Sequence, residues 1–498
     1  MTHTHTFRLG ILVASLQLLT ACGGGGSDTA LVPTTAPSTP STPSTPSTPS
    51  TPTTPTPPAT PTTPSSGGTL ALAAKTCPTG TQGSAYAGCS MVATGGKTSY
   101  TFSIANDPNY PPLPEGLSID PATGRISSAQ IGGQGYYQTK IVVRDAAGAS
   151  VSRLVGFSIA GNNAFLAQIF PANSIFHHRV DQASTGLPVD TSPAAPIPSA
   201  YTASTIKPFF GNNGYPPFPN GIPALSVPAT QPNVAVTTTV YQSYFTAGPF
   251  PANAPIEGTS TSVAAGGDGH VSIYKMAGGG HPPMLYEFWQ GIKKPNGTWT
   301  ASSNALWANT DSNALTPQDN GTTDAAGLPV GPLVVNADEV IGSGSPTAPN
   351  GTVRHPIRFT LNHMLNYWVW PATSTAGVGS CTTSSGAPIG TRQLLSQSAP
   401  PASCTQSAAP GQIYRLKASV STPACATTSP QAAIIITGLR NYGMILSDNG
   451  QSGGLIGTPD SRWRDDDLSC LRSLNLSHFE PVNVSSLMMS VSSGQTSH

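Results

Sequence analysis

The sequence has few charged side chains and no net charge. Asp, Glu, Lys and Arg make up only 8% of its 498 residues, and 21 basic residues balance 21 acidic ones. A protein that binds nucleic acid needs a basic surface to neutralise phosphates, so no nucleic-acid partner is expected. Long helical patterns are scarce as well. A chain so rich in Thr, Ser, Gly and Pro is typical of an extracellular β-protein, and its length allows more than one domain.

The sequence also lacks motifs that would name a reaction or a metal. It has no H-E-x-x-H zinc sequence and no phosphate-binding loop. The pair His177-His178 has no partner at metal-ligand spacing, so we interpret it as a surface pair and leave the metal unassigned. The reaction class therefore has to be inferred from groupings of single side chains, and the sequence leaves open whether the chain is an enzyme.

Cysteine is scarce and odd in number. One of the seven, Cys22, has a separate explanation given below. We expect the other six to pair by proximity, as disulfides persist outside the cytoplasm. The expected pairs are Cys77–Cys89, Cys381–Cys404 and Cys425–Cys470. The last four cysteines allow three connectivities, and free buried thiols are the alternative.

The N-terminus is predicted to be a signal peptide that covers residues 1–21. Its apolar run of 13 residues, 9–21, is too short at about 1.5 Å per residue to cross a hydrocarbon core of about 30 Å. Leu19-Thr20-Ala21-Cys22 resembles the bacterial lipoprotein box, which implies cleavage before Cys22 and lipidation of that residue. The expected location is the outer membrane or cell surface, with the membrane as a partner through the lipid. The alternative is an ordinary secretory peptide.

Residues 22–69 are predicted to form a stalk. They begin with glycines and then repeat Ser-Thr-Pro between Ser38 and Pro52. No apolar residue recurs with any period, so no core can form. Proline favours extended polyproline II structure at about 3.1 Å per residue, which would lift the rest of the chain off the membrane.

Residues 70–160 are predicted to form a small β-domain. Lys140–Arg144 alternates apolar and polar residues, and Asp120-Pro121 with Gly124 predicts a turn. The run L-P-E-G-L-S-I-D-P-A-T-G-R-I and the ending V-V-R-D-A-A-G-A-S resemble the immunoglobulin-like repeat of bacterial surface proteins, which is a cadherin-like β-sandwich. The resemblance makes calcium the one cofactor to consider. The acids available are too scattered to form a cage, and the run from Asp145 to Gly148 is predicted to be a hairpin turn. Those acids are Asp107, Glu115, Asp120 and Asp145.

Residues 161–485 are predicted to form one large β-rich domain, and residues 486–498 a disordered tail. Val, Ile, Tyr, Phe and Trp in short runs predict strands at 269–275, 284–289, 331–336, 353–361, 366–370, 413–418 and 444–450. Helices are predicted at 430–442 and from Asp465 to Leu474. The motifs Y-G-M-I-L-S-D-N-G and R-W-R-D-D-D-L resemble a family of secreted or surface bacterial proteins and imply no activity. The fold class is thus mainly β: a small immunoglobulin-like sandwich followed by a large β-rich domain with two or three helices.

Asp268, His270 and Glu287 are the first candidate catalytic residues. Asp268 and His270 are two positions apart at the start of a strand, so their side chains point to one face. Together they could bind a metal ion, or one could act as a base that the other orients. The alternative is a histidine held by a turn aspartate. Glu287 lies among aromatic residues, where burial would favour a general acid, with Asp338 or Glu339 as the second carboxylate of a glycoside hydrolase. The alternative is an edge-strand glutamate in water.

Arg354, His355 and Arg358 are the next candidates. On a regular strand the two arginines share one face and could bind a carboxylate or sulfate, while His355 could serve as the base of a lyase acting on uronic acids. The alternative is a buried histidine paired with Asp338 or Asp448. Trp368 and Trp370 share a face and either stack on sugar rings or belong to the core.

Two functions follow from these groupings. The first is a surface enzyme, a hydrolase or lyase on a polysaccharide, with the catalytic set Asp268, His270, Glu287, Asp338, Arg354 and His355 and the substrate-binding set Arg358, Trp368 and Trp370. The second is a non-catalytic surface module that binds glycan or protein. An enzyme should bring His270, Glu287 and His355 into one cleft, whereas a binding module scatters them.

Overall fold

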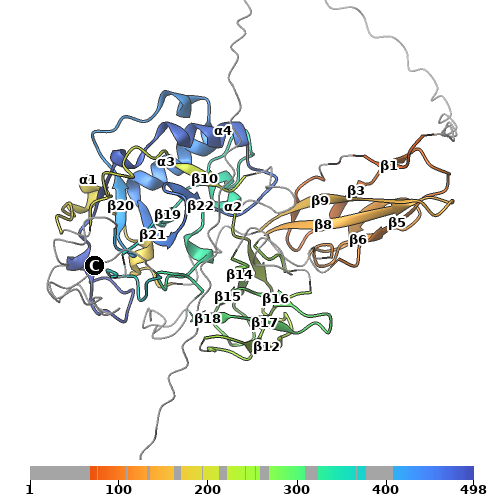
Figure 1. Ribbon diagram of the computed structural model, residues 1–498, viewed down its shortest axis with the longest axis horizontal. Helices are drawn as coiled ribbons and strands as arrows, with labels where there is room; N and C mark the ends of the chain where they lie inside the picture. The colour runs from red at the N-terminus through yellow and green to blue at the C-terminus, as the bar shows by residue number, and fades with distance from the viewer. Residues whose placement is uncertain are drawn as a thin grey trace, which may run out of the picture. The chain divides into compact units, whose positions relative to one another are not determined.

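The structure is a computed structural model, and strands dominate it (Figure 1). It describes residues 68–497 except 74, 76, 108–109, 111, 132–134, 162–169, 193–194, 212–220, 242, 253, 258–267, 309–322, 366 and 377–407. All described residues belong to one compact unit, Thr63–His498. The predicted fold class is confirmed. Within the described part of the chain, no helix is long and apolar enough to span a bilayer.

The N-terminal part of the described chain is a pair of packed sheets with a short third one. A four-stranded sheet has the order β2-β9-β8-β5, a three-stranded sheet the order β3-β7-β6, and β1 pairs with β4. The strands are β1 (Ala71–Leu72), β2 (Gly80–Thr81), β3 (Tyr86–Ser90), β4 (Ala93–Thr94), β5 (Thr101–Ile104), β6 (Ser118–Ile119), β7 (Arg125–Ser128), β8 (Gly135–Arg144) and β9 (Ser150–Ala160).

Sequence features of this part explain its core and its hairpin. Ile141 and Val143 alternate on β8 and are fully buried, as the period of two predicts. The hairpin turn between β8 and β9 is also confirmed, because Asp145 accepts the N–H groups of Ala147 and Ala149 at 2.9 Å each. The predicted Cys77–Cys89 disulfide closes the neighbouring loop.

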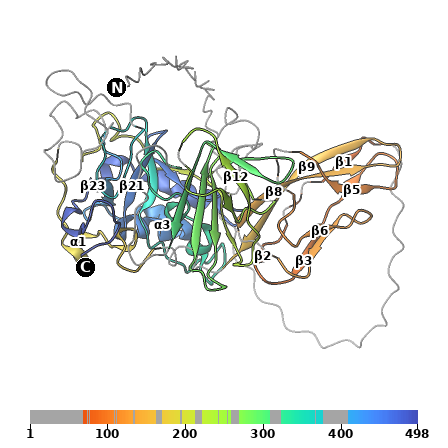
Figure 2. The ribbon, with the colours of Figure 1, turned by 90° about the horizontal axis from the view of Figure 1, so that it is seen from below.

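Two further four-stranded sheets follow, with the orders β11-β14-β15-β18 and β13-β12-β17-β16. Their apolar residues join those of the first part in one hydrophobic cluster, and Figure 2 shows β8 and β2 beside these strands. The contact is close at Gly135, where a Cβ would overlap the Leu225 side chain. The strands are β11 (Ala224–Val227), β12 (Val234–Thr238), β13 (Ala247–Gly248), β14 (Val271–Lys275), β15 (Met284–Trp289), β16 (Ile292–Lys293), β17 (Trp299–Ala301) and β18 (Ser303–Ala308).

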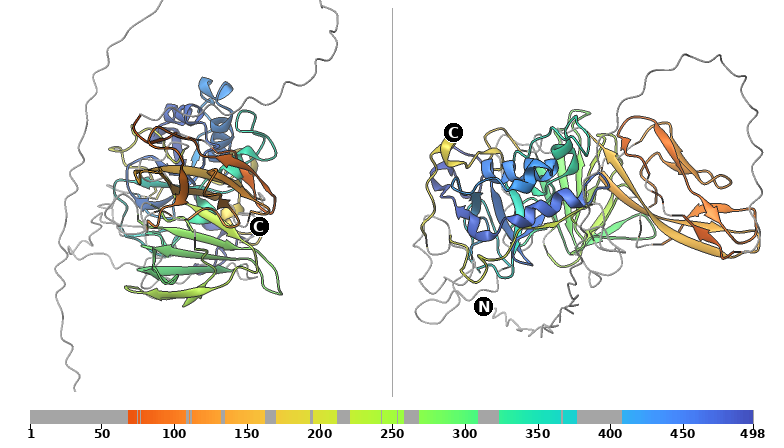
Figure 3. Two further views of the ribbon diagram at one scale, coloured as in Figure 1. Left: turned by 90° about the vertical axis from the view of Figure 1, so that its right-hand side faces the viewer. Right: turned by 90° about the horizontal axis from the view of Figure 1, so that it is seen from above.

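A six-stranded mixed sheet with the order β10-β22-β19-β21-β20-β23 completes the fold. Helix α3 packs on it through Ile435 and Leu439, which share a core cluster with Phe359 and Leu446 of the sheet. Figure 3 shows the C-terminal helices on one side of this sheet. The strands are β10 (Lys207–Phe209), β19 (Ile357–Leu361), β20 (Ile413–Leu416), β21 (Met444–Asn449), β22 (Gly454–Ile456) and β23 (Phe479–Pro481).

The helices are short apart from α3. The α-helices are α1 (Gln182–Thr185), α2 (Ala337–Ile341), α3 (Pro430–Asn441) and α4 (Asp465–Ser469), and the 3-10 turns are η2 (Ile175–His177), η4 (Gly331–Leu333), η5 (Ala424–Thr427), η6 (Cys470–Ser473), η7 (Leu476–His478) and η8 (Ser485–Leu487). The predicted helix at 430–442 is confirmed. The helix predicted from Asp465 divides into α4 and η6, and the predicted Cys425–Cys470 disulfide ties η5 to η6. The predicted pair Cys381–Cys404 lies outside the described residues.

Three local predictions are wrong. Residues 331–336 form η4 and the cap of α2, because Pro332 cannot donate to a strand ladder and Asn336 caps a helix. Residues 367–370 form no strand, and their side chains are buried at consecutive positions. Residues 486–497 do not extend as a free tail, since the N–H of Thr496 donates to the Asn173 carbonyl at 2.8 Å.

Candidate functional site

A pocket with a volume of about 670 Å³ lies between η2, α2 and the chain that leads into β19. Its polar lining comes from four separate parts of the sequence: His177, Glu339, Ser343, Asn350, Thr352, Arg354, His355 and Tyr442. Arg354 is exposed, whereas His355 is only 2% exposed. The structure therefore brings the predicted residues Arg354 and His355 into one concave site.

Glu339 and His355 form a buried ion pair in the wall of this pocket. Nε2 of His355 lies 3.2 and 3.1 Å from the two carboxylate oxygens of Glu339, and Nδ1 lies 3.0 Å from the Pro356 carbonyl. Both ring nitrogens thus face acceptors, which fits the doubly protonated imidazolium. Burial lowers the pKa of His355, but the Glu339 charge and these hydrogen bonds outweigh it, so that the pKa is raised above its usual value.

The local fold explains where Glu339 points. Asn336 caps α2 by accepting the N–H of Glu339 at 2.9 Å, and Oε1 of Glu339 accepts the N–H of Asn336 at 2.9 Å. This reciprocal capping box fixes the carboxylate at the start of the helix. His355 was weighed as a buried histidine paired with Asp338 or Asp448; its actual partner is the neighbouring residue Glu339.

His177 is the second histidine of the pocket, and the interpretation of His177-His178 as a surface pair missed it. Burial and the positive charge of His355 lower the pKa of His177, against the opposing effect of the Arg354 and Phe170 carbonyls. Its Nε2 atom is buried and has no hydrogen-bond partner among the residues that the structure describes. The pKa values of the two histidines in this pocket are therefore shifted in opposite directions.

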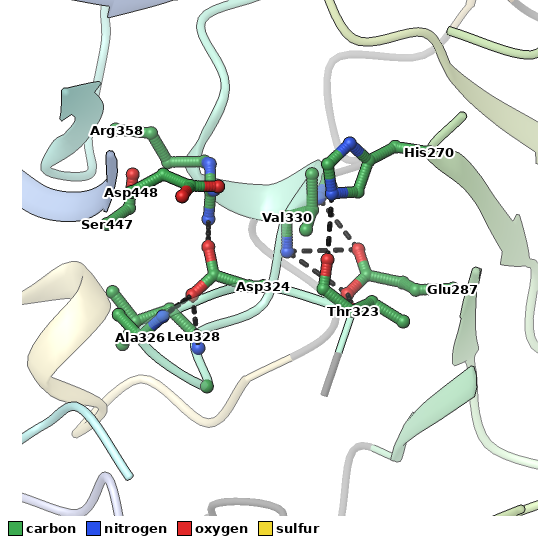
Figure 4. Close-up of polar contacts among 12 residues, drawn as sticks. His270, Glu287, Thr323, Asp324, Ala326, Leu328, Val330, Arg358, Ser447 and Asp448 are labelled. Atoms are coloured by element: carbon green, nitrogen blue, oxygen red, sulfur yellow. Dashed lines mark hydrogen bonds and ion pairs between the residues drawn. The ribbon is translucent and has the colours of Figure 1, made fainter. Parts of the chain in front are cut away.

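Asp268, His270 and Arg358 lie elsewhere, in a cluster of charged residues that we call the ionic cluster. Figure 4 shows His270 and Arg358 in it. The cluster also contains Glu257, Glu287, Asp324 and Asp448. His270 is 3% exposed, with Nδ1 2.5 Å from Glu257 and Nε2 2.8 Å from the Thr323 carbonyl. Burial opposes its protonation, but Glu257 and Asp268 raise the pKa of His270 to about 9. The histidine is thus bonded to Glu257, while the exposed Asp268 acts on it by charge.

Glu287 is 1% exposed and accepts hydrogen bonds on both oxygens. Its donors and distances are Ser272 Oγ at 2.7 Å, Trp307 Nε1 at 3.0 Å, Thr323 Oγ1 at 3.3 Å, Val330 N at 3.0 and 3.1 Å and Gly331 N at 2.8 Å. These hydrogen bonds show that the Glu287 side chain fixes the turn that begins η4, and its burial contradicts the alternative of an edge-strand glutamate in water. The role of Glu287 as a general acid stays a prediction.

Arg358 cannot bind substrate together with Arg354, since it is 1% exposed and forms an ion pair with the buried Asp324. The regular strand begins only at Ile357, so the assumed alternation from Arg354 does not hold. Asp324 in turn accepts the N–H groups of Ala326 at 2.7 Å and Leu328 at 3.0 Å. Burial and the Asp324 charge raise the pKa of Asp448 to about 7, against the opposing charge of Arg358.

Three predicted residues take no part in either group. Asp338 pairs with Arg462 at 2.6 Å and does not meet Glu287. Trp368 and Trp370 are 7% and 3% exposed and belong to a hydrophobic core, so the proposed stacking on sugar rings is wrong. His270, Glu287 and His355 therefore do not converge in one cleft.

Several residues were missed by sequence reasoning. Glu257, Asp324 and His177 stand far from their partners in the chain and carry no motif. The run Gly450-Gln451-Ser452-Gly453-Gly454 does have the spacing G-x-S-x-G, but it connects β21 to β22 rather than a strand to a helix, and Ser452 Oγ accepts the N–H of Asn362 at 3.0 Å. Among the described residues, no group of three or more His, Cys, Asp or Glu is placed to hold a metal ion.

Comparisons with known proteins identify one part of the chain. A family model described as "Putative Ig domain" matches residues 77–160. A comparison with curated proteins gives no match. The match falls within the predicted segment 70–160 and agrees with its packed sheets. The chain is therefore similar to immunoglobulin-like modules over residues 77–160.

Proposed function

We propose that the pocket is the active site of a surface-displayed lyase that cleaves polysaccharides at uronic acid residues. The observation that supports it is one pocket lined by His177 and His355, whose pKa values are shifted in opposite directions, together with the exposed Arg354. Titratable groups whose environments push their pKa values apart mark acid and base roles. Both histidines and the arginine would act on one anionic sugar.

The chemistry of such a lyase is a β-elimination. The imidazole of His177, whose pKa is lowered by burial, would take the proton at C5 of the uronic acid. The C4–O bond then breaks, a double bond forms between C4 and C5, and the departing oxygen takes a proton from water. Arg354 would bind the sugar carboxylate with its planar fork, and the positive charge of His355 would stabilise the negative charge that develops there.

Elimination fits this pocket better than hydrolysis. Glycoside hydrolases need two carboxyl groups about 5–9 Å apart. Among the described residues that line the pocket, Glu339 is the only acid, and both of its oxygens already serve His355 or the helix cap. The predicted lipid at Cys22 and the stalk at 22–69 would display the site at the outer membrane or cell surface, where such polysaccharides are encountered.

The test uses the purified protein on a panel of uronic-acid polysaccharides. Ultraviolet absorbance of the unsaturated sugar reports elimination, and new reducing ends report any cleavage. We expect His177→Asn to lower the rate about 10²–10⁴-fold, which is the usual contribution of a general base. His363→Asn is the matched control, because His363 is exposed and does not line the pocket. Wild-type activity in His177→Asn, or reducing ends without the unsaturated product, would contradict the proposal.

The immunoglobulin-like domain and the separation of His270 and Glu287 from His355 favour a second candidate, a surface module that binds an anionic glycan without cleaving it. Here Arg354 would supply the charge and no bond would break. Two results together support this alternative. The wild-type protein binds a polyuronate and Arg354→Ala does not, and the wild-type protein forms no product from any polysaccharide of the panel.

A further inference from the structure

We propose that Asp338 is a positioning residue that anchors α2 to the end of the immunoglobulin-like domain and thereby holds Glu339 against His355. The catalytic consequence rests on the function proposed above. The structural part of the proposal is argued from contacts among residues between Ser158 and Arg462. It can be tested without an activity assay.

The immunoglobulin-like side of the anchor is the end of β9. Ser158, which is fully buried, donates its hydroxyl to Oδ1 of Asp460 at 2.7 Å and accepts the N–H of Ser461 at 2.8 Å. Two residues after Ser158 the strand ends, and the N–H of Gly161 donates to Oδ2 of Asp338 at 3.2 Å. The strand end therefore meets both carboxylates directly.

Arg462 connects these two carboxylates. Its Nη1 lies 2.6 Å from Oδ1 of Asp338, and its Nη2 lies 2.6 Å from Oδ2 of Asp460. Asp338 and Asp460 are 7% and 3% exposed. Removal of one partner from a buried ion pair leaves the other charge without compensation, which strongly destabilises the folded state. This network therefore resists movement of α2.

Helix α2 has only five residues, so its placement depends on its flanks. Asp338 and Glu339 are consecutive, and about 100° separates consecutive side chains on a helix of 3.6 residues per turn. One therefore faces the immunoglobulin-like domain while the other faces the pocket. The Glu339 carbonyl accepts the N–H of Thr352 at 2.7 Å. A shift of α2 after loss of the Asp338 contacts would carry Glu339 away from His355.

The charges around His355 make this shift measurable. Glu339 and the Pro356 carbonyl bond to it, and His177 and Arg354 line the same pocket with it. Tyr442 lines the pocket from the end of α3. After burial, Glu339 has the largest effect on the pKa of His355, so a change in that pKa reports chiefly movement of Glu339. Ser158→Ala changes no charge, so any change in the pKa of His355 in that variant comes from movement alone.

The experiment follows the imidazole signal of His355 by NMR through a pH titration of the full chain, assigned by its absence in His355→Asn. We expect Asp338→Asn to lower the pKa of His355 towards its ordinary value while circular dichroism stays unchanged. Ser158→Ala, which acts from the immunoglobulin-like domain, should lower it less. Asp466→Asn is the control, because Asp466 is exposed on α4.

An unchanged pKa of His355 in folded Asp338→Asn overturns the proposal. If Asp338→Asn does not fold, Ser158→Ala decides: a lowered pKa supports the anchor and an unchanged pKa refutes it. The result is independent of the proposed lyase, since the titration needs no substrate. If activity is present, the pH–rate profile of Asp338→Asn should move with the pKa of His355, and a uniform loss at every pH would contradict positioning.

Discussion

Glu287→Gln should destabilise the protein rather than remove a catalytic acid. The substitution keeps the shape of the side chain but replaces one acceptor oxygen by an amide NH₂, which only donates. If the remaining oxygen stays with Ser272 and Gly331, the amide faces the indole N–H of Trp307 and the hydroxyl of Thr323. The indole N–H would then lose its acceptor at a site that is 1% exposed, whereas the Thr323 hydroxyl can turn to accept from the amide.

The size of the effect follows from the lost contact of Trp307. A buried donor that loses its partner costs about 1–3 kcal/mol. Loss of the negative charge weakens the remaining bonds as well, because hydrogen bonds to charged groups are the stronger ones. The midpoint of urea unfolding should fall by an amount on the order of 1 M.

The assay compares urea unfolding of the wild-type protein, Glu287→Gln and Glu115→Gln by circular dichroism and tryptophan fluorescence. Glu115 is exposed, so its variant should stay within about 0.5 kcal/mol of the wild type. An unchanged midpoint in Glu287→Gln refutes the reasoning from hydrogen bonds. An unchanged midpoint together with lost activity would return Glu287 to the catalytic residues.

Two further predictions concern stability. The pKa of His270 is raised to about 9 in the folded state, above its ordinary value of about 6.5, so its stabilising contribution is complete below about pH 6.5 and disappears as the pH rises through about 9. Urea unfolding across this range should show the decline in wild type and a much smaller one in Glu257→Gln; equal declines in both would exclude Glu257 as the cause. For the disulfides, sequence separations of 45 and 12 residues predict losses of about 4 kcal/mol for Cys425→Ala with Cys470→Ala and about 3 kcal/mol for Cys77→Ala with Cys89→Ala. Calorimetry under non-reducing conditions measures both, and a larger effect of the shorter loop would argue against control by chain entropy.

Short sequence patterns predicted correctly those helices and hairpins that are specified by residues close together in the chain. Helix α3 was recognisable because Pro430 starts it and Ile435 and Leu439 recur at helical spacing. The β8–β9 hairpin was recognisable from alternation and from the turn at Asp145. The strand predicted at 331–336 failed because the β propensity of Leu333, Val334 and Val335 was weighed without Pro332 and the Asn336 cap.

The candidate site was less predictable, since its geometry depends on pairs distant in the chain. Sequence singled out Arg354 and His355 correctly as neighbours in one site, but His177 comes from a position 178 residues before His355. Nothing in a single sequence links such residues. Trp368 and Trp370 show the opposite error, because aromatic residues on one face of an assumed strand fit a core as well as a sugar platform.

The position of Gly135 limits which other immunoglobulin-like domains could replace the one in this protein. Its backbone lies so close to Ala224 and Leu225 that a methyl group would collide with them. Transplanting the immunoglobulin-like repeat of another protein in its place would therefore require a glycine at this spot and a matching contour along β8. A chimera that ignores this fit should express poorly, whereas shortening the proline-rich segment 22–69 should leave the fold of the remaining chain unchanged.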